Sequence, residues 1–269
     1  MITFPNGKIN LGLYVTGKRK DGYHDLISCF CPITWCDALE IIESKSFQFS
    51  TSGANIPGDP NNNLCKKAFD LLSGEFDIPP VHIHLHKVIP IGAGLGGGSA
   101  DGAFTLNMLN EFFQLRLTNN NLESYAAQLG SDCPFFIENQ SAIATGIGTE
   151  LEVIQVSLSD YYIALIHPNI HISSADGYAS VTYSQPMFDL KEILSQKPLS
   201  EWRDLLRNDF EPSVFKNYPE IKRLKTKLYY HGAIYASMTG SGSTVYGIFN
   251  SEPDISEVAG SNEVFVSRM

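Results

Sequence analysis

The residues best suited to chemistry lie in one glycine-rich stretch, from Pro90 to Ala100. Five of its eleven residues are glycine, whereas average glycine usage is roughly 7%. Glycine accepts positive φ angles and leaves room for a close neighbour, although it costs about 0.5–1 kcal/mol per residue within regular structure. This cluster of glycines therefore predicts a tight loop lined with backbone N–H groups, which suits a bound phosphate.

The flanking patterns place this loop between a strand and a helix. Residues 81–86 alternate with a period of two, which is typical of a strand. Ser99 to Asp101 offer helix-capping chemistry, and apolar residues then recur at helical spacing. A helix N-terminus adds unpaired N–H groups and the positive end of the helix dipole, both of which favour an anion. The residues expected to hold phosphate are Pro90, Gly92, Ala93, Gly94, Leu95, Gly96, Gly97, Gly98, Ser99 and Ala100.

Other glycine loops fit the stretch less well. A P-loop ends in Gly-Lys-Ser/Thr, whereas this loop closes on Gly-Ser-Ala at residues 98–100. Residues 92–97 match a dinucleotide fingerprint loosely, but that motif opens a parallel βαβ unit and has an acidic residue about 20 positions later. A flexible linker is disfavoured because Pro90, Ile91 and Leu95 are apolar.

With five further motifs in the order of the family, the loop resembles the central motif of the GHMP kinases, a superfamily of small-molecule kinases. These motifs are Lys8-Ile9-Asn10-Leu11, Arg19 to His24, Asn63-Leu64, Gly130 to Phe136, and Thr239 to Ser243. The resemblance implies an α+β fold of two subdomains. The first, over residues 1–155, is a mixed αβ subdomain that carries the glycine loop and binds ATP. The second, over residues 156–269, is a ferredoxin-like αβ subdomain.

The resemblance also implies the chemistry, which is transfer of a phosphoryl group from ATP to an alcohol, with Mg²⁺ as the expected companion of the nucleotide. It makes Asp132 the catalytic carboxylate that accepts or polarises the hydroxyl proton, and Lys8 the cation beside it. It places Asn63 and Lys87 at the border of the adenine pocket. The pattern alone leaves simpler interpretations open, because Asp132 could cap the next turn and Lys8 could lie on a solvated strand face.

Within the superfamily, the motifs resemble the branch whose substrate is the cytidyl diphosphate of a branched polyol, in non-mevalonate isoprenoid synthesis. The residues that the resemblance assigns to this substrate are Asn10, Tyr23, His24, Tyr178, Gly240 and Ser241. We expect the cytosine to lie between the rings of Tyr23 and Tyr178, with either His24 or nearby backbone groups at its edge. The glycine-rich turn at 239–243 is a second group of N–H donors, suited to the diphosphate.

Two other identities remain as alternatives. A homoserine or mevalonate type of kinase is disfavoured by the Tyr23-His24 pair and by the three glycines at 96–98. A catalytically silent sensor with the same fold is disfavoured because both Lys8 and Asp132 are present.

The chain departs from the superfamily at two places in the loop and helix. Mevalonate-type relatives carry a serine at Gly97 or Gly98 and use it toward Mg²⁺, so no metal ligand is assigned here. Gly102 stands where alanine is expected, and we expect it to loosen the first helical turn.

His82, His84 and His86 share one face of the predicted strand and could hold Zn²⁺ or Ni²⁺. Same-face neighbours on a strand lie roughly 6.6–6.8 Å apart, so one ion reaches two of them easily and three poorly. We therefore favour a structural role for these histidines.

Composition narrows the function classes. With 269 residues, 43% of them hydrophobic, the chain can bury a large core, and its net charge of −10 disfavours nucleic-acid and anionic-membrane surfaces. Five cysteines without a CxxC motif indicate reduced thiols. With no pattern typical of a leader or a membrane span, we expect a cytoplasmic protein, a monomer or weak homodimer, with ATP and a small-molecule substrate as partners.

Overall fold

The computed structural model describes residues 1–179, 181–183 and 185–269. Its contacts divide the chain into two compact units, each built from segments that are far apart in the sequence. Unit 1 contains Met1–Lys8, Trp35–Ile91 and Gly96–Gln140, and unit 2 contains Ile9–Thr34, Gly92–Leu95 and Ser141–Met269. This grouping differs from a linear division at residue 155, because residues 9–34 form long strands that share a sheet with residues 142–153.

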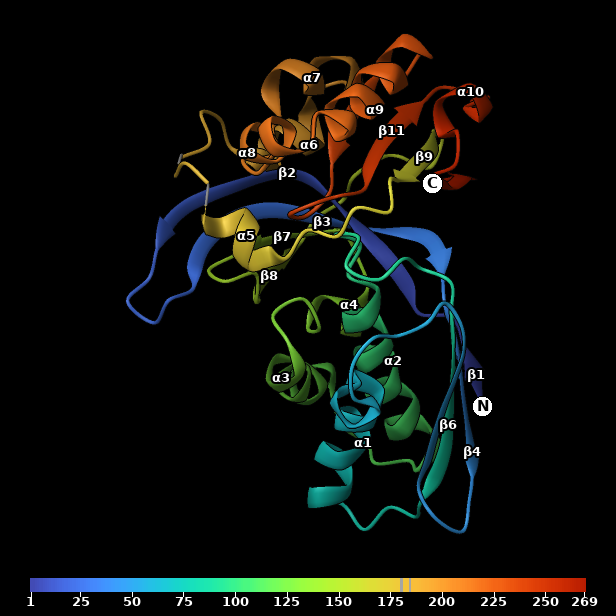
Figure 1. The fold of residues 1–269 in the computed structure, drawn as a ribbon. Coiled ribbons are helices and arrows are strands. Elements are labelled where there is room, and N and C mark those ends of the chain that lie inside the picture. The colour runs from blue at the N-terminus through green and yellow to red at the C-terminus, as the bar shows by residue number, and fades with distance from the viewer. Residues whose placement is uncertain (180, 184) are drawn as a thin grey trace. The chain divides into compact units, whose positions relative to one another are not determined.

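Unit 1 is a four-stranded sheet with helices against it (Figure 1). The strand order is β1 (Ile2–Thr3), β4 (Ala38–Glu43), β6 (Val81–Lys87) and β5 (Gln48–Gly53). Strand β4 pairs antiparallel with β6, whereas β5 runs parallel to it. The helices are α1 (Leu64–Glu75), α2 (Gly97–Phe112), α3 (Asn119–Leu129) and α4 (Phe135–Glu138). Leu39, Ile41, Ile83 and Leu85 are fully buried, as the alternating pattern of these strands predicts.

The other face of β6 carries the three histidines, and each has a hydroxyl partner on β5. Ser50 Oγ lies 2.7 Å from His82 Nε2 and 2.8 Å from His84 Nδ1. Ser52 Oγ lies 2.9 Å from both His84 Nε2 and His86 Nδ1. These contacts support the structural role. Both serines belong to β5, which no pattern named in the sequence analysis indicated.

The helices of unit 1 begin at identifiable caps. Asn63 caps α1 by accepting a hydrogen bond from the Cys65 N–H. Helix α2 begins at Gly97, earlier than the Ser99 cap that we expected, and its N-cap is Gly96 with a φ of 70°. The first helical turn therefore contains the last glycines of the loop.

Gly102 has a different role from the loosening that we expected. It lies within the continuous helix α2, and a Cβ atom added to it would stand 2.9 Å from Leu64 Cβ at the start of α1. Because Leu64 Cβ is fixed to its own backbone, it cannot move aside as the tip of a long side chain could. The missing side chain at Gly102 allows α1 and α2 to pack closely.

Two further four-stranded sheets lie mostly in unit 2. One has the order β2 (Asn6–Lys18), β3 (His24–Cys36), β7 (Ala142–Thr145) and β8 (Glu150–Val153). The start of β2, up to Lys8, and the end of β3, from Trp35, belong to unit 1. The other has the antiparallel order β10 (Tyr235–Met238), β11 (Val245–Phe249), β9 (Tyr162–His167) and β12 (Glu263–Arg268). The antiparallel second sheet confirms the prediction for the second half of the chain.

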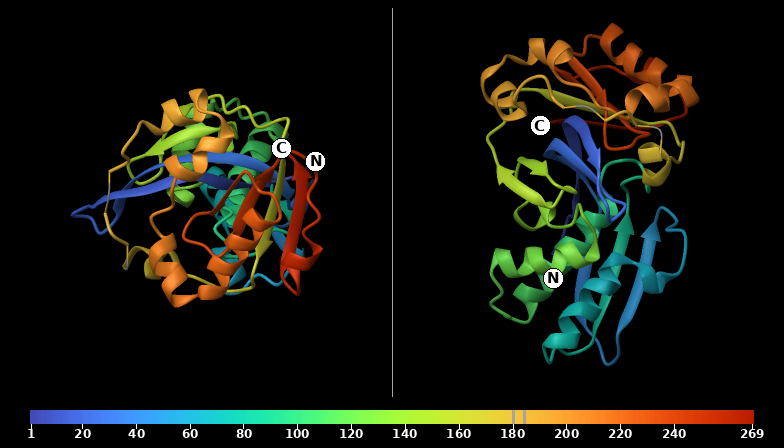
Figure 2. Two further views of the ribbon diagram at one scale, coloured as in Figure 1. Left: turned by 90° about the horizontal axis from the view of Figure 1, so that it is seen from above. Right: turned by 90° about the vertical axis from the view of Figure 1, so that its left-hand side faces the viewer.

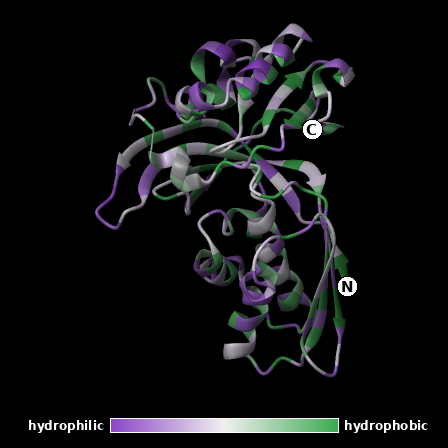
Figure 3. Cartoon of the chain, viewed as in Figure 1, coloured by the Kyte–Doolittle hydropathy of each residue, from purple (hydrophilic) through white to green (hydrophobic). Residues whose placement is uncertain are grey.

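Helices pack against this second sheet, as Figure 2 shows for the segment around α9. The helices of unit 2 are α5 (Ser174–Ala179), α6 (Leu190–Gln196), α7 (Trp202–Leu205), α8 (Glu211–Asn217), α9 (Pro219–Tyr230) and α10 (Ser256–Ala259). Ile221, Leu224 and Leu228 of α9 enter the core, so this helix buries one apolar face. Figure 3 shows the polar residues of α9 on its outer surface. No helix among the described residues is long and apolar enough to cross a membrane.

Gly102→Ala is expected to destabilise the protein, although alanine favours a helix over glycine by about 1 kcal/mol. The added methyl group would force α1 and α2 apart, and such overpacking typically costs about 1–3 kcal/mol. Chemical denaturation measures the difference. Gly74→Ala in α1 is the matched control, because its Cβ atom would meet nothing within 4 Å. Equal gains in stability for both variants would contradict the packing role.

Candidate active site

Lys8 and Asp132, which the sequence analysis singled out, form an ion pair within unit 1. Lys8 Nζ lies 3.5 Å from Asp132 Oδ2. The Lys8 side chain is 5% exposed and that of Asp132 is 32% exposed, so the carboxylate is the accessible partner. Lys8 comes from β2, and Asp132 lies in the turn between α3 and α4. The pair therefore offers a solvent-accessible carboxylate backed by a buried positive charge.

The N-terminus of α2 lies beside this pair. A Cβ atom on Gly96 would stand 3.3 Å from Lys8 Cε and 3.0 Å from the ring of Phe136, so the loop backbone passes close to both. The first N–H groups of a helix have no acceptor within it. Gly98 is exposed in this turn, and a Cβ atom there would meet nothing within 4 Å. The turn thus presents open backbone donors next to a carboxylate and an ammonium group.

Lys87 and Asn63, expected near the adenine, have their functional groups engaged inside unit 1. Lys87 Nζ lies 2.5 Å from Asp37 Oδ2 and 2.7 Å from Asp101 Oδ2. Burial alone would lower the pKa of Lys87, but the two carboxylates outweigh it and raise the pKa above its usual value. The Asn63 amide oxygen caps α1. Their contact with an adenine therefore stays a prediction.

The first part of the glycine loop, Gly92–Leu95, belongs to unit 2, where it packs on the turn at residues 239–243. The Thr239 hydroxyl donates to Gly94 O at 3.1 Å, and the Thr244 N–H donates to Ala93 O at 3.3 Å. A Cβ atom on Gly94 would stand 2.3 Å from Thr239 O. The two glycine-rich stretches that the sequence analysis assigned to phosphates are therefore in direct contact here.

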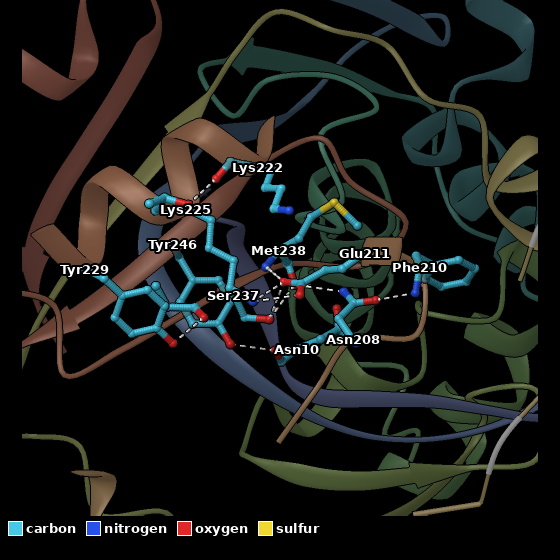
Figure 4. A network of polar contacts seen from close by, with 12 residues as sticks. Asn10, Asn208, Phe210, Glu211, Lys222, Lys225, Tyr229, Ser237, Met238 and Tyr246 are labelled. Atoms are coloured by element: carbon cyan, nitrogen blue, oxygen red, sulfur yellow. Dashed lines mark hydrogen bonds and ion pairs between the residues drawn. The ribbon is translucent and has the colours of Figure 1, made fainter. Parts of the chain in front are cut away.

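Two buried asparagines hold this turn in place. Asn10 Oδ1 accepts hydrogen bonds from the Gly240 N–H at 2.9 Å and the Thr239 hydroxyl at 3.2 Å. Asn208 Nδ2 donates to Met238 O at 2.8 Å and Gly240 O at 2.9 Å (Figure 4). Asn10 is 2% exposed, so its amide stabilises the turn from the buried side. The sequence did not reveal this role, because a strand asparagine looks the same whether it contacts a ligand or a backbone.

Glu211 completes the network and was missed by the sequence analysis. Its Oε1 accepts from the Met238 N–H at 2.9 Å and from the Ser237 hydroxyl at 3.2 Å, and Lys225 Nζ lies 2.6 Å from its Oε2. Figure 4 shows Glu211 between α9 and strand β10. The carboxylate anchors the strand that leads into the turn. A single buried glutamate at the start of a helix carries no distinctive sequence signal.

An aromatic stack lies close to the same turn. The rings of His24 and Tyr178 are parallel within 12°, with centroids 4.5 Å apart. Burial, with a smaller effect from Lys18, lowers the pKa of His24, so the imidazole is neutral at pH 7. A Cβ atom on Gly177 would stand 3.1 Å from Ser241 Cβ, which places α5 against the turn.

Tyr23 is 60% exposed, and the described ring contacts pair Tyr178 with His24 and Phe210. The ring stacked on Tyr178 is thus His24, where we expected Tyr23 to lie opposite across a cytosine. The structure nevertheless brings together His24, Tyr178, Gly240 and Ser241 as neighbours in unit 2.

Comparisons with known proteins found matching family models and similar curated proteins. The model of the GHMP kinases N terminal domain matches residues 63–140, and that of the GHMP kinases C terminal matches residues 190–262. The chain is 52% identical over 255 residues to the 4-diphosphocytidyl-2-C-methyl-D-erythritol kinase of Cytophaga hutchinsonii, covering 94% of each chain.

Solved structures show the same fold. A crystal structure of 4-(cytidine 5'-diphospho)-2C-methyl-D-erythritol kinase superposes with a TM-score of 0.82 at 27% identity, covering 99% of this chain and 98% of the other. The mevalonate kinase of Methanococcus jannaschii shares the fold with a TM-score of 0.74, at 16% identity over 100% of this chain and 98% of its own.

Proposed function

Because the chain belongs to the 4-diphosphocytidyl-2-C-methyl-D-erythritol kinases, a family of GHMP kinases, we propose that it phosphorylates that cytidyl alcohol with ATP. The product is the 2-phosphate. The observation that carries the proposal is the Lys8–Asp132 pair beside the open N-terminal turn of α2. A carboxylate for the hydroxyl and backbone donors for the phosphates are the parts that phosphoryl transfer requires.

The nucleotide phosphates are proposed to bind the loop from Pro90 to Ala100. Gly98 supports this because its backbone is exposed and free of neighbouring atoms, so an anion can approach the N–H groups closely. The positive end of the α2 dipole adds attraction. This local arrangement explains how a chain with a net charge of −10 binds a polyanion.

Asp132 is proposed to orient the acceptor hydroxyl and accept its proton as the oxygen attacks the γ-phosphorus. The Lys8 ammonium, 3.5 Å away, fixes the carboxylate and offsets negative charge that develops in the transition state. Phosphoryl transfer depends on positioning and charge neutralisation more than on covalent chemistry by the protein. An ion pair with one buried and one accessible partner suits both tasks.

Mg²⁺ is proposed to enter with ATP, where it neutralises phosphate charge. Among the described residues there is no group of three His, Cys, Asp or Glu side chains that could hold a metal ion. We therefore propose that the ion is held mainly by phosphate oxygens and water, as Mg²⁺ commonly is in kinases. We assign no protein ligand to it.

The cytidyl diphosphate is proposed to bind the surface formed by the His24–Tyr178 stack and the 239–243 turn in unit 2. Aromatic rings suit a base, and the N–H groups of the glycine turn suit a diphosphate. A neutral imidazole can read the edge of a base through one donor and one acceptor. Asn10 and Asn208 act in this proposal by positioning the turn.

A coupled assay of ADP release with a panel of alcohols tests the function. We expect turnover with the cytidyl substrate and at least about 10²-fold lower kcat/KM with homoserine or mevalonate, because neither alcohol can stack on the aromatic pair or bind the turn. Preference for either competitor would redirect the assignment within the GHMP kinases. Nucleotide binding without turnover of any alcohol would indicate a silent sensor.

Asp132→Asn should lower kcat by on the order of 10²–10⁴, because the amide cannot accept the hydroxyl proton. The dissociation constant of ATP should change little, since the backbone of the loop is untouched. Steady-state kinetics and calorimetry measure the two quantities. Asp70→Asn, at an exposed position on α1, is the control and should retain full activity. Turnover near that of the parent would remove Asp132 from the mechanism.

Tyr178→Ala should raise KM for the cytidyl substrate by roughly ten- to a hundred-fold, because stacking on an aromatic ring contributes about 1–3 kcal/mol per base in nucleic-acid sites. KM for ATP should stay nearly constant. Tyr230→Ala is the control, since that ring is 87% exposed at the end of α9. An effect confined to ATP would place Tyr178 outside the substrate site.

A further inference from the structure

A buried cluster of charges lies beneath the N-terminal turn of α2. Lys87 Nζ bridges Asp37 and Asp101 at 2.5 and 2.7 Å, and all three side chains are at most 4% exposed. A Cβ atom on Gly97, in the first turn of α2, would stand 3.1 Å from Lys87 Nζ. The backbone of this turn, which is proposed to bind phosphate, is therefore next to the Lys87 ammonium group in unit 1.

The two carboxylates are held differently. Asp37 Oδ1 accepts backbone N–H groups from Val88 at 2.6 Å and Ile89 at 2.8 Å. Asp101 Oδ1 is buried and has no hydrogen-bond partner among the described residues. An ionised carboxylate with an unpaired buried oxygen is costly, whereas backbone donors stabilise the ionised form. If one proton enters the cluster, the geometry directs it to Asp101.

The groups around Asp101 agree with this assignment. Burial raises the pKa of Asp101 to about 7; Lys87 opposes the shift and Asp37 adds to it. Cys65 faces the cluster from α1, and burial raises the pKa of its thiol, so it stays uncharged. The Thr105 hydroxyl, also on α2, donates to the Asp101 carbonyl oxygen and brings no charge. At neutral pH the cluster therefore lies between a net charge of zero and one negative charge.

We propose that Asp101 takes up a proton when the phosphates of ATP bind at the N-terminus of α2. The proposal rests on the proposed function, because it requires phosphate at that turn. A polyanion above Gly97 disfavours a second negative charge below it. Protonation of Asp101 leaves the Lys87 ammonium paired with Asp37 alone and removes the repulsion.

The direction of the pH dependence follows from linkage. The bound protein holds more protons than the free protein, so ATP binds most tightly below about pH 7. Affinity should then fall by roughly three- to tenfold between about pH 6.5 and 8.5, which corresponds to a binding-induced shift of up to about one unit.

Isothermal titration calorimetry of the whole protein with ATPγS, in buffers of different ionisation enthalpy at pH 7, tests the proposal. The thiophosphate of this analogue is already ionised at that pH, so proton uptake reports the protein. We expect uptake of up to about half a proton per nucleotide in the parent protein. Binding without net uptake would overturn the inference and leave the nucleotide site intact, whereas no binding would overturn the proposed function.

The Asp101→Asn variant tests whether Asp101 is the residue that takes up the proton. The amide is isosteric with the protonated acid, so we expect tight binding, no proton uptake and a flat pH dependence of affinity above pH 6.5. Asp70→Asn, which changes an exposed carboxylate of the same unit, should retain the uptake. Uptake that persists in a folded Asp101→Asn protein would exclude Asp101 as the acceptor. If that variant does not fold, the parent protein's uptake between pH 6 and 8.5 still decides, because it must be centred near pH 7.

Discussion

The tightest constraint in this structure is the lack of a Cβ atom at two glycines of the loop, Gly94 and Gly96. In unit 2, the Gly94 backbone approaches the 239–243 turn so closely that a Cβ atom would overlap Thr239 O. In unit 1, Gly96 takes a left-handed conformation as the cap of α2 and lies against Lys8 and Phe136. Only glycine satisfies a positive φ and a close approach together. Within unit 1, the start of α2 beside Lys8 depends on the backbone of Gly96.

The roles of the loop glycines are nevertheless distinct. Gly94 and Gly96 serve packing and conformation, whereas Gly98 faces open space and gains nothing within the protein from lacking a side chain. A helix position without a steric reason for glycine loses up to about 1 kcal/mol relative to alanine. That cost is understandable if a ligand needs the room, and it makes Gly98 the residue of the loop that points most directly to phosphate.

The strand before the glycine loop and the helix after it could be predicted because their apolar periodicity is clear, as β6 and α2 show. The sequence analysis missed β5, whose polar Ser50 and Ser52 are explained only by the histidines of the neighbouring strand. It also missed α6 and α8, because seven residues carry too little periodicity to distinguish a short helix from a turn. Hydrogen bonds between residues 30 or more positions apart depend on the tertiary fold, which local sequence patterns do not reveal.

In the candidate site, too, the sequence predicted some features and missed others. The resemblance singled out Lys8 and Asp132, and the structure pairs them in unit 1, whereas their catalytic roles and that of the loop stay proposals. The motifs did not separate residues that face a ligand from residues that hold the backbone, as Asn10 demonstrates.

A polar residue in a motif can therefore stabilise the buried backbone as readily as it can contact a ligand. Asn10 and Asn208 bind opposite sides of the Gly240 peptide, one accepting from its N–H and the other donating to its carbonyl. Both groups of that peptide are thus fixed by protein before any ligand arrives, so the turn is preorganised. The role proposed for the two asparagines is therefore to fix the geometry of the turn, whose remaining N–H groups are the ones proposed for the diphosphate.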